Sequence, residues 1–552
     1  MSITPAAALR RLEAARLEFA CGAEKLRLLR GLERAHLHSA RMVLRLHEQL
    51  CFMRAYPDDA ELLALVEAML ERFAHRADLR RFRSALADTG IAGTAIHYRF
   101  FWPTARWLRR RWPEQLAIDW NALDDSSRLA NALPLLATPL EATWLRTRLP
   151  AARDALEHLS GGPKYPARFL IDRISSLPGN DTTREYFCDA LDIPYILHPG
   201  PDTPSRSSNH VHAPVAFVRS PLSRSRPDLP RELRRPPRSV RPASRREGEH
   251  LIERAHEALV TRSRDLDAFS YGNARDVWLV DDGDGLQWAL VGMVPERRLL
   301  LRAAYGFLTL RNGVPIGYGQ LDVLCRTIDI SFNSFETFRG SEVARVFARL
   351  LAAGRAVFGA AAFTLEPYQL GHHNREGIAS GAWWFYYKLG FRPRNPEIRT
   401  LAETELLRMQ GEPGHRSSSE VLKRLASDYL YFETEAVRAP YWPRLAELGA
   451  RAAEHLTAVG GSDRERAVRD CVARALRRLG LKKLPSERSA RLAWERWAPI
   501  VALLRMEGWS RSERLSLARV ISAKGAASDR DFLDRFDAHP RLARALRELV
   551  RA

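Results

Sequence analysis

The residues best suited to binding an anion lie between Phe338 and Ala344, in the run FRGSEVA. An apolar alternation precedes this run and predicts a strand, whereas apolar residues at helical spacing follow it. The first turn of a helix has N–H groups without intrahelical partners and a positive dipole end, so a helix placed directly after a strand can receive a phosphate. The alternative is that Ser341 caps the helix and Glu342 is a favourable first-turn acid, with no ligand.

Three other groups of residues have side chains suited to chemistry, but their spacing in the sequence does not match a known site. His372 and His373 are adjacent, but no third ligand follows at a regular spacing, so we expect no metal there. The run from Gly161 to Lys164 lacks the spacing and the following Ser or Thr of a phosphate-binding loop, so we expect a turn. The cysteines form no Cys-x-x-Cys pair, and neither a disulfide framework nor a zinc site is predicted. They are Cys21, Cys51, Cys188, Cys325 and Cys471.

The chain has 552 residues and a formal charge of +20. This length predicts about three or four domains at roughly 100 to 200 residues each. Such a charge would suit a nucleic-acid or anionic-membrane partner. Most of the positive charge is arginine, spread along amphipathic helices and one linker, so nucleic acid is the less favoured partner. No apolar run could span a bilayer and the chain's start lacks a signal-peptide pattern, so we expect a cytoplasmic protein.

The first part of the chain, residues 1–160, repeats apolar residues at spacings of three and four and predicts a helical module. Within it, four tryptophans stand among four arginines between Trp102 and Trp120. This mixture could stack bases or lie at a membrane surface, but helix packing with the arginines reaching solvent is the favoured interpretation. Residues 161–198 predict an irregular or short-strand extension of the module.

Residues 199–246 are rich in Pro, Arg and Ser and have little apolar surface to bury. Such a composition cannot offset the entropy of ordering the chain, so we expect an extended basic linker. Strands then dominate, with an Asn312-Gly313 tight turn between two of them, before a strand, helix, strand and helix between Thr327 and Pro393. Residues 247–402 therefore predict a mixed-sheet α/β domain, and residues 403–552 a C-terminal helical module. The predicted protein is multidomain, α and α/β, with helical modules flanking the central domain.

The central domain resembles the GCN5-related N-acetyltransferase (GNAT) superfamily, over about residues 246–400. The most specific likeness is the run FYYKLGFRP from Phe385, which is similar to the family's late helix and turn. The next is the run from Phe338 to Ala344, which is similar to the family's acyl-CoA pyrophosphate loop. Glu342 departs from the pattern, since the family usually has glycine there.

This resemblance implies a GNAT-like fold and acetyl-CoA or another acyl-CoA as co-substrate, with no metal. Two strands of the family splay apart to hold the thioester, and the positions here are Ile328 to Phe335 and Ala362 to Tyr368. The implied cofactor-binding residues are Phe335, Arg339, Gly340, Ser341, Glu342, Val343, Ala344 and Asn374.

The resemblance also implies roles in catalysis. Tyr386 matches the general acid that protonates the departing thiolate, and Glu336, at the end of a strand, is the candidate base for an unidentified amine acceptor. Each has an alternative, since Glu336 could be a solvated turn carboxylate and Tyr386 a core aromatic. The separation of Asn374 from Tyr386 is longer than usual in the family. The run from Glu366 to Gly371 is unusual for the family, and we expect it to shape an acceptor pocket.

The sequence is therefore consistent with two functions. The first is an acyl-CoA-dependent N-acyltransferase in which an amine attacks the thioester directly. The alternative is a non-enzymatic helical scaffold or nucleic-acid-binding protein with a degenerate acyltransferase fold, which Glu342 and the charge of +20 favour.

Overall fold

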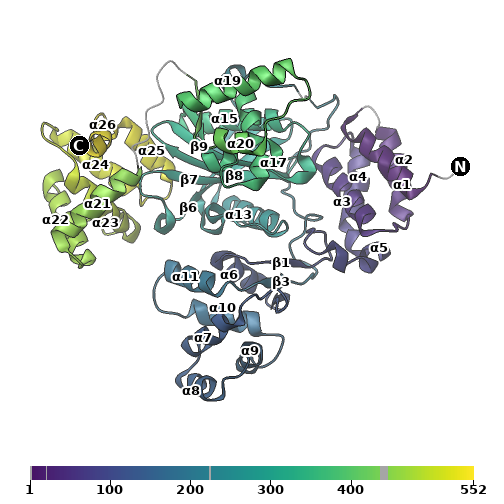
Figure 1. Cartoon of the computed structure of the whole chain (residues 1–552), viewed down its shortest axis with the longest axis horizontal. Helices are drawn as coiled ribbons and strands as arrows, with labels where there is room; N and C mark the ends of the chain where they lie inside the picture. The colour runs from purple at the N-terminus through teal and green to yellow at the C-terminus, as the bar shows by residue number, and fades with distance from the viewer. Residues whose placement is uncertain (1–2, 20–21, 223–224, 435–444, 552) are drawn as a thin grey trace. The chain divides into compact units, whose positions relative to one another are not determined.

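The computed structural model describes residues 3–19, 22–222, 225–434 and 445–551, and two compact units make up the chain (Figure 1). Cys21 lies outside the described residues. Both units combine stretches that are separated in sequence, whereas the sequence predicts consecutive segments. Unit 1 consists of Met1–Leu222, His250–Ser270 and Arg311–Pro315, and unit 2 of Ser223–Glu249, Tyr271–Leu310 and Ile316–Ala552.

Amphipathic helices form the first part of unit 1, and their buried leucines and valines share one core. Asp59 caps the fourth helix by accepting a hydrogen bond from the N–H of Leu62 at 2.8 Å. The prediction of helices is confirmed for this stretch. The helices are α1 (Pro5–Ala14), α2 (Gly22–Arg34), α3 (Ala40–Ala55), α4 (Ala60–Glu71) and α5 (Ala77–Arg81).

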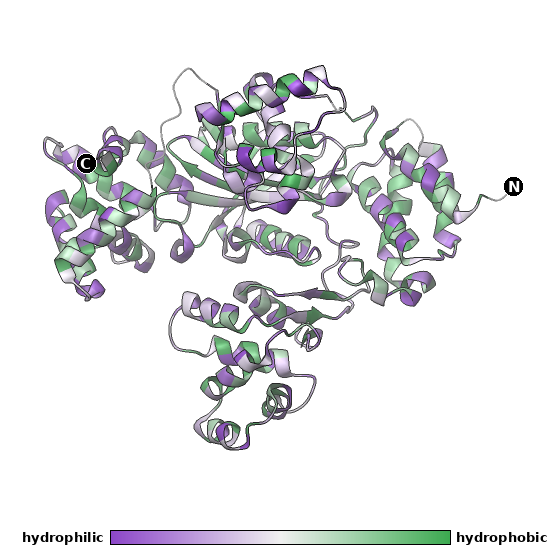
Figure 2. Cartoon of the chain, viewed as in Figure 1, coloured by the Kyte–Doolittle hydropathy of each residue, from purple (hydrophilic) through white to green (hydrophobic). Residues whose placement is uncertain are grey.

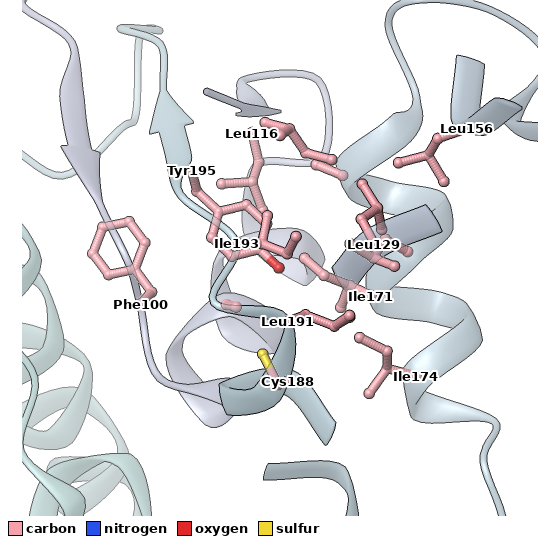
Figure 3. Close-up of a cluster of buried hydrophobic side chains, with 14 of the residues drawn as sticks. Phe100, Leu116, Leu129, Leu156, Ile171, Ile174, Cys188, Leu191, Ile193 and Tyr195 are labelled. Carbon is pink, nitrogen blue, oxygen red and sulfur yellow. The ribbon is translucent and has the colours of Figure 1, made fainter. Parts of the chain in front are cut away.

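The second part of unit 1 packs helices against a three-stranded antiparallel sheet of order β1-β3-β2. Trp102 and Trp112 are buried in its core, which includes the side chains of Leu116, Ile171 and Tyr195 (Figure 3). The tryptophans of the aromatic-basic run therefore pack a core, as the favoured interpretation holds. The elements are β1 (Ile96–Tyr98), α6 (Trp102–Arg111), β2 (Leu116–Ile118), α7 (Ser126–Leu136), α8 (Pro139–Arg148), α9 (Ala152–Ser160), α10 (Pro166–Ser175), α11 (Asp181–Leu191) and β3 (Tyr195–Leu197).

Residues 161–198 are more helical than the sequence predicts. They hold α10, α11 and β3, so one short strand is present and the rest is mainly helix. The apolar run Phe169-Leu170-Ile171 lies inside α10, where apolar residues also recur at Ala167 and Ile174 on the buried side. A short apolar run does not distinguish a strand from a buried helix by itself.

Unit 2 contains a nine-stranded sheet of order β11-β12-β10-β9-β8-β7-β6-β5-β4. The strands are β4 (Ser239–Pro242), β5 (Gly272–Gly283), β6 (Leu286–Met293), β7 (Ala303–Arg311), β8 (Val314–Leu324), β9 (Thr327–Ser334), β10 (Ala362–Leu365), β11 (Arg392–Pro393) and β12 (Leu430–Glu433). Asn312 and Gly313 take φ angles of 48° and 75° between β7 and β8, which confirms the predicted tight turn. The mixed α/β prediction for this part of the chain is confirmed.

Helix α15 (Val343–Phe358) connects β9 to β10, which pair in parallel. A Cβ on Gly354 would lie 2.8 Å from Cδ1 of Ile328, so the absence of a side chain lets α15 approach β9 closely. Phe347 of α15 contacts the rings of Phe332 and Tyr386, which places α18 (Ala382–Leu389) beside α15. The helix, strand and helix order between β9 and β11 thus follows the prediction.

Helices α16 (Pro367–Leu370) and α17 (Arg375–Ser380) and the start of α19 (Pro396–Gly411) are not anticipated by the sequence, whereas α20 (Ser419–Leu425) lies in the segment predicted as a helical module. After them the chain returns to the sheet as β12, between β10 and β11. The sheet therefore extends beyond residue 402, where the sequence predicts the end of the α/β domain.

The segment predicted as a linker has ordered structure at its C-terminal end. Residues Leu229–Arg234 form α12, and β4 pairs antiparallel with β5. Arg349 of α15 is fully buried and donates hydrogen bonds to the backbone carbonyls of Glu232 and Arg235 and to the carboxylate of Asp282. These bonds supply the order that the Pro- and Arg-rich composition does not indicate. Helices α13 (Arg245–Val260) and α14 (Asp267–Ser270) follow.

The C-terminal helices confirm the predicted helical pattern, and hydrophobic and hydrophilic stretches alternate along them (Figure 2). A buried polar cluster joins them to the sheet. Arg298 donates to the carbonyls of Lys524, Ala526 and Ala527, and the carboxylate of Asp276 accepts from the hydroxyl groups of Tyr305 and Ser528. The helices are α21 (Leu445–Gly460), α22 (Arg464–Leu479), α23 (Arg488–Leu503), α24 (Arg511–Ala523), α25 (Asp529–Ala538) and α26 (Leu542–Arg551).

Candidate functional site

The predicted anion-binding run forms a turn and the start of α15. Phe335 ends β9's pairing with β8 by donating its N–H to the Ile316 carbonyl, and the 3-10 helix η5 (Glu336–Phe338) follows. Gly340 has a φ of 86°, and no described atom lies within 4 Å of the position that a Cβ would take there. The turn therefore opens to space on that side, next to the N–H groups of the first turn of α15 at Val343 and Ala344.

The side chains of this turn form an internal network. The Ser341 hydroxyl donates to the Phe338 carbonyl, so it does not cap α15 as the no-ligand alternative requires. Glu342 is the N-cap residue instead, and its side chain accepts no capping bond from the described residues. Arg339 donates to the Ser334 carbonyl and pairs with Glu376 of α17.

The buried carboxylate of Glu342 has an arginine beside it. Its Oε2 accepts from Nη1 of Arg345 at 3.0 Å, and Arg345 also lies 3.6 Å from Asp284. Arg345 offsets the negative charge that the sequence places next to the anion-binding turn. An unpaired carboxylate at this position would repel a bound anion, and the ion pair with Arg345 reduces that repulsion at the N-terminus of α15.

Strands β9 and β10 pair over only three residues, and β10 ends at Leu365. The strand expected from Ala362 to Tyr368 is therefore shorter than the sequence predicts, because Pro367–Leu370 forms α16. The last pair is Asp329 with Thr364, whereas β9 continues to Ser334 and stays paired with β8. Beyond the last pair, the edge of β9 bonds to the side-chain amide of Gln369 in α16. The Phe332 N–H donates to Oε1 of Gln369 at 3.3 Å, and its carbonyl accepts from Nε2 at 2.9 Å.

The hydroxyl of Tyr386 lies beside the same edge of β9, next to Gln369. Its hydroxyl oxygen lies 2.8 Å from Nε2 of Gln369 and accepts a hydrogen bond from it. Burial raises the pKa of the Tyr386 hydroxyl, so this group keeps its proton across the neutral range. The structure thus brings Tyr386, Gln369 and the edge of Phe332 together. Gln369 belongs to the run from Glu366 to Gly371 that the sequence marks as unusual, but no individual role was predicted for it.

Glu336 and Asn374 have local roles. Glu336 is exposed at the start of η5, as its solvated-turn alternative describes. The side chain of Asn374 caps α17 by accepting from the N–H of Gly377 at 3.1 Å, and it donates to the carbonyl of Tyr368. These bonds give Asn374 a structural task in holding α16 and α17 together.

Three carboxylates that the sequence interpretation did not group lie where β9 and β10 part. Asp322 of β8 stands directly opposite Asp329 of β9, and Glu366 directly follows β10. Burial, and then the charges of Glu366 and Asp322, raise the pKa of Asp329 from 3.8 to about 7. Burial also raises the pKa values of Asp322 and Glu366. The sequence signal that could have indicated this group was the presence of acidic residues within otherwise apolar strands.

Comparison with family models, with curated proteins and with solved structures found no match to this chain. Its function has therefore to be inferred from its own residues and their geometry.

Among the described residues, no group of three His, Cys, Asp or Glu side chains is arranged to hold a metal ion. The rings of His372 and His373 contact one another edge to face, 4.1 Å between centroids. In the same described part of the chain, no helix is both long and apolar enough to cross a bilayer.

Replacing Asp329 by asparagine is expected to stabilise the protein increasingly as the pH rises from 4 to 8. The folded-state pKa of about 7 exceeds the ordinary 3.8, so the folded state binds more protons and wild-type stability falls over this window. Asparagine cannot ionise, so the variant should gain about 1 to 3 kcal/mol over wild type at pH 8. Urea unfolding at several pH values measures this.

The matched control is Asp470→Asn, at an exposed position of α22, which should change the free energy of unfolding by less than about 0.5 kcal/mol. A constant difference between Asp329→Asn and wild type from pH 4 to 8 would show that Asp329 does not titrate in this window.

Proposed function

We propose that the chain is an acyl-CoA-dependent N-acyltransferase that uses acetyl-CoA or another acyl-CoA. The observation that carries this proposal is the edge of β9 at Phe332, where the strand has parted from β10 and bonds to the side-chain amide of Gln369. A primary amide presents the same acceptor and donor as a peptide group. The pantetheine arm of CoA also contains amides, so it can replace Gln369 at this edge.

The surrounding elements support the same ligand. The order strand, Gly-containing turn, helix and parallel strand agrees with the GNAT resemblance, and β9 extends five residues beyond its last pair with β10. The turn at Gly340 opens to space beside the first turn of α15, where N–H groups and the helix dipole favour a pyrophosphate. One ligand would then extend from this turn along β9 to Tyr386.

The chemistry assigned to this site is direct transfer. A neutral amine nitrogen attacks the thioester carbonyl carbon, the C–N bond forms and the C–S bond breaks. The sulfur takes a proton from the Tyr386 hydroxyl, which the raised pKa keeps protonated until then. The amine has first lost its extra proton to a carboxylate, and that proton and the one from the new amide nitrogen pass on to solvent and to the tyrosine oxygen.

CoA at millimolar concentration is expected to raise the melting temperature of the full chain, because a ligand that binds only the folded state stabilises it. Gln369→Ala should enlarge this rise. The variant has no side-chain amide to displace from Phe332, so CoA should bind about ten times more tightly, equivalent to about 1.4 kcal/mol. Without CoA, the variant should melt below wild type because the Phe332 edge loses its partner.

Gln287→Ala, on strand β6 of the same sheet, serves as the control and should leave the CoA effect unchanged. No change in melting temperature with CoA in either the wild type or Gln369→Ala would refute the proposed function. An equal rise in both proteins would show that CoA binds elsewhere than the edge of β9.

A further inference from the structure

The C-terminal helices form a cavity that contains none of the residues assigned to acyl transfer. Helices α23 and α24 pack together, as do α24 and α25, and the segment from Leu481 to Ser486 connects α22 to α23 (Figure 1). Residues of α23, α24, α25 and this segment line the cavity, whose volume is about 1000 Å³. A cavity of this size can hold a small organic molecule.

Apolar side chains form much of the cavity wall. Leu481 and Leu484 of the segment after α22 and Leu515 of α24 line it, and each of these leucines is only half-buried. Trp494 of α23 also lines the cavity, and its indole N–H donates to Oγ of Ser522 at 3.0 Å, so the indole nitrogen needs no further partner. Apolar side chains left partly exposed around a hollow indicate a ligand with an apolar part.

Three positively charged side chains from three different elements line the same cavity. They are Lys483 of the segment after α22, Arg519 of α24 and Arg535 of α25, and all three residues are exposed. None of the three side chains has a hydrogen-bond or ion-pair partner among the described residues. A row of cations on a single helix is typical of a solvated face, whereas these cations surround one hollow.

One acid lines the cavity with these cations and does not neutralise them. Asp531 lies one turn before Arg535 on α25, a spacing at which ion pairs commonly form, yet the two side chains form none in the described chain. Three cations and one acid leave the wall with a net positive charge. A cleft lined by one sign of charge concentrates the field and attracts the opposite charge. Charge complementarity therefore favours an anion.

The wall offers groups for binding and no arrangement for a reaction. A serine hydroxyl becomes a nucleophile when a base such as histidine lies beside it. Among the described residues that line the cavity there is no histidine or cysteine, and the Ser522 hydroxyl accepts from Trp494. We therefore expect a ligand that is bound and not converted.

We propose that this cavity binds an amphipathic organic anion, in which one compact anionic group is attached to an apolar body. Arg519, Arg535 and Lys483 bind the anionic group, and the leucines and Trp494 contact the apolar body. This site goes beyond the proposed acyl transfer and does not depend on it. Carboxylate and phosphate both match the geometry of a guanidinium group, so a fatty acid and a single-chain phospholipid offer the same chemistry.

The test is calorimetric titration of the full chain with octanoate. Saturable binding is expected, and octanoate should bind at least about tenfold more tightly than butanoate, because it removes four more methylene groups from water. The uncharged 1-octanol and the cationic octylammonium should both bind more weakly than octanoate. Octyl phosphate distinguishes the sources, since tighter binding of this probe assigns a phosphate group and tighter binding of octanoate assigns a carboxylate.

Variants locate the binding. Arg519→Gln and Arg535→Gln should each weaken octanoate binding about threefold, and the double variant about tenfold, as expected for exposed ion pairs. The matched control is Arg511→Gln, which replaces an exposed arginine of α24 that does not line the cavity and should leave binding unchanged.

Three results would overturn the proposal. The first is no binding of either octanoate or octyl phosphate to the wild-type chain. The second is octylammonium binding as tight as that of octanoate, which would exclude a role for the cations. The third is octanoate binding that the double variant leaves unchanged. The first two comparisons use the wild-type chain and so do not depend on whether a variant folds.

Discussion

Tyr386→Phe is expected to lower the rate of acyl transfer about 100-fold, the smallest effect usual for removing a general acid. The hydroxyl is the proton donor beside the gap between β9 and β10, and phenylalanine keeps the ring contacts with Phe347 and Phe391. The melting temperature should change little, because Gln369 keeps its bonds to Phe332. Thiol release from acetyl-CoA, with 1,5-diaminopentane as the acceptor, measures the rate.

Tyr387→Phe is the matched control. This tyrosine is next along α18 and is nearly as buried, but its ring stacks on Trp383. We expect removal of the Tyr387 hydroxyl to change the rate of acyl transfer less than threefold, which is the usual scatter for a residue that takes no part in the reaction. Equal losses in both variants would mean that α18 packing, and not a proton from Tyr386, is what the rate depends on.

Arg349→Met is expected to lower the free energy of unfolding by about 3 kcal/mol, because it leaves the carboxylate of Asp282 buried without its main partner. Arg349 is fully buried, and Asp282 is 1% exposed at its side chain. Among the described residues, the half-exposed Arg235, 3.2 Å away, would remain to pair with Asp282. Urea unfolding of the full chain measures the change.

Two further variants make this result specific. Adding Asp282→Leu to Arg349→Met should recover at least half of the loss, since an apolar pair can replace a buried ion pair. Arg245→Met breaks an exposed pair with Glu249 and should cost less than about 0.5 kcal/mol. A loss from Arg349→Met as small as that of Arg245→Met would contradict the role of this buried pair.

The strands and helices of unit 2 are largely predictable because their apolar periods are strong. The strands around the Asn312-Gly313 turn and helix α15 fall where the apolar residues repeat. Helix α12 and strand β4 are not predictable in this way. Their order depends on Arg349 and on pairing with β5, both distant in sequence, while their own composition favours an extended chain.

The candidate site was predictable only in part, for a similar reason. The turn from Arg339 to Glu342 and the position of Tyr386 follow from local patterns and from the resemblance. The bond between Gln369 and Phe332 and the pairing of Asp322 with Asp329 depend on strand register and on where two strands part. Register is a property of paired strands, and a single sequence shows only each strand alone.

The position of β12 limits where the chain can be shortened. A fragment that ended at residue 402 would lose β12, which would expose the edge of β10 and leave the terminal strand β11 without its partner. A fragment that began at residue 247 would lose β4 and the carbonyl partners of Arg349. The smallest fragment that keeps all nine strands and α12 therefore runs from about Asp228 to Thr434. It begins inside the segment predicted as a linker and ends well beyond the predicted end of the α/β domain at residue 402.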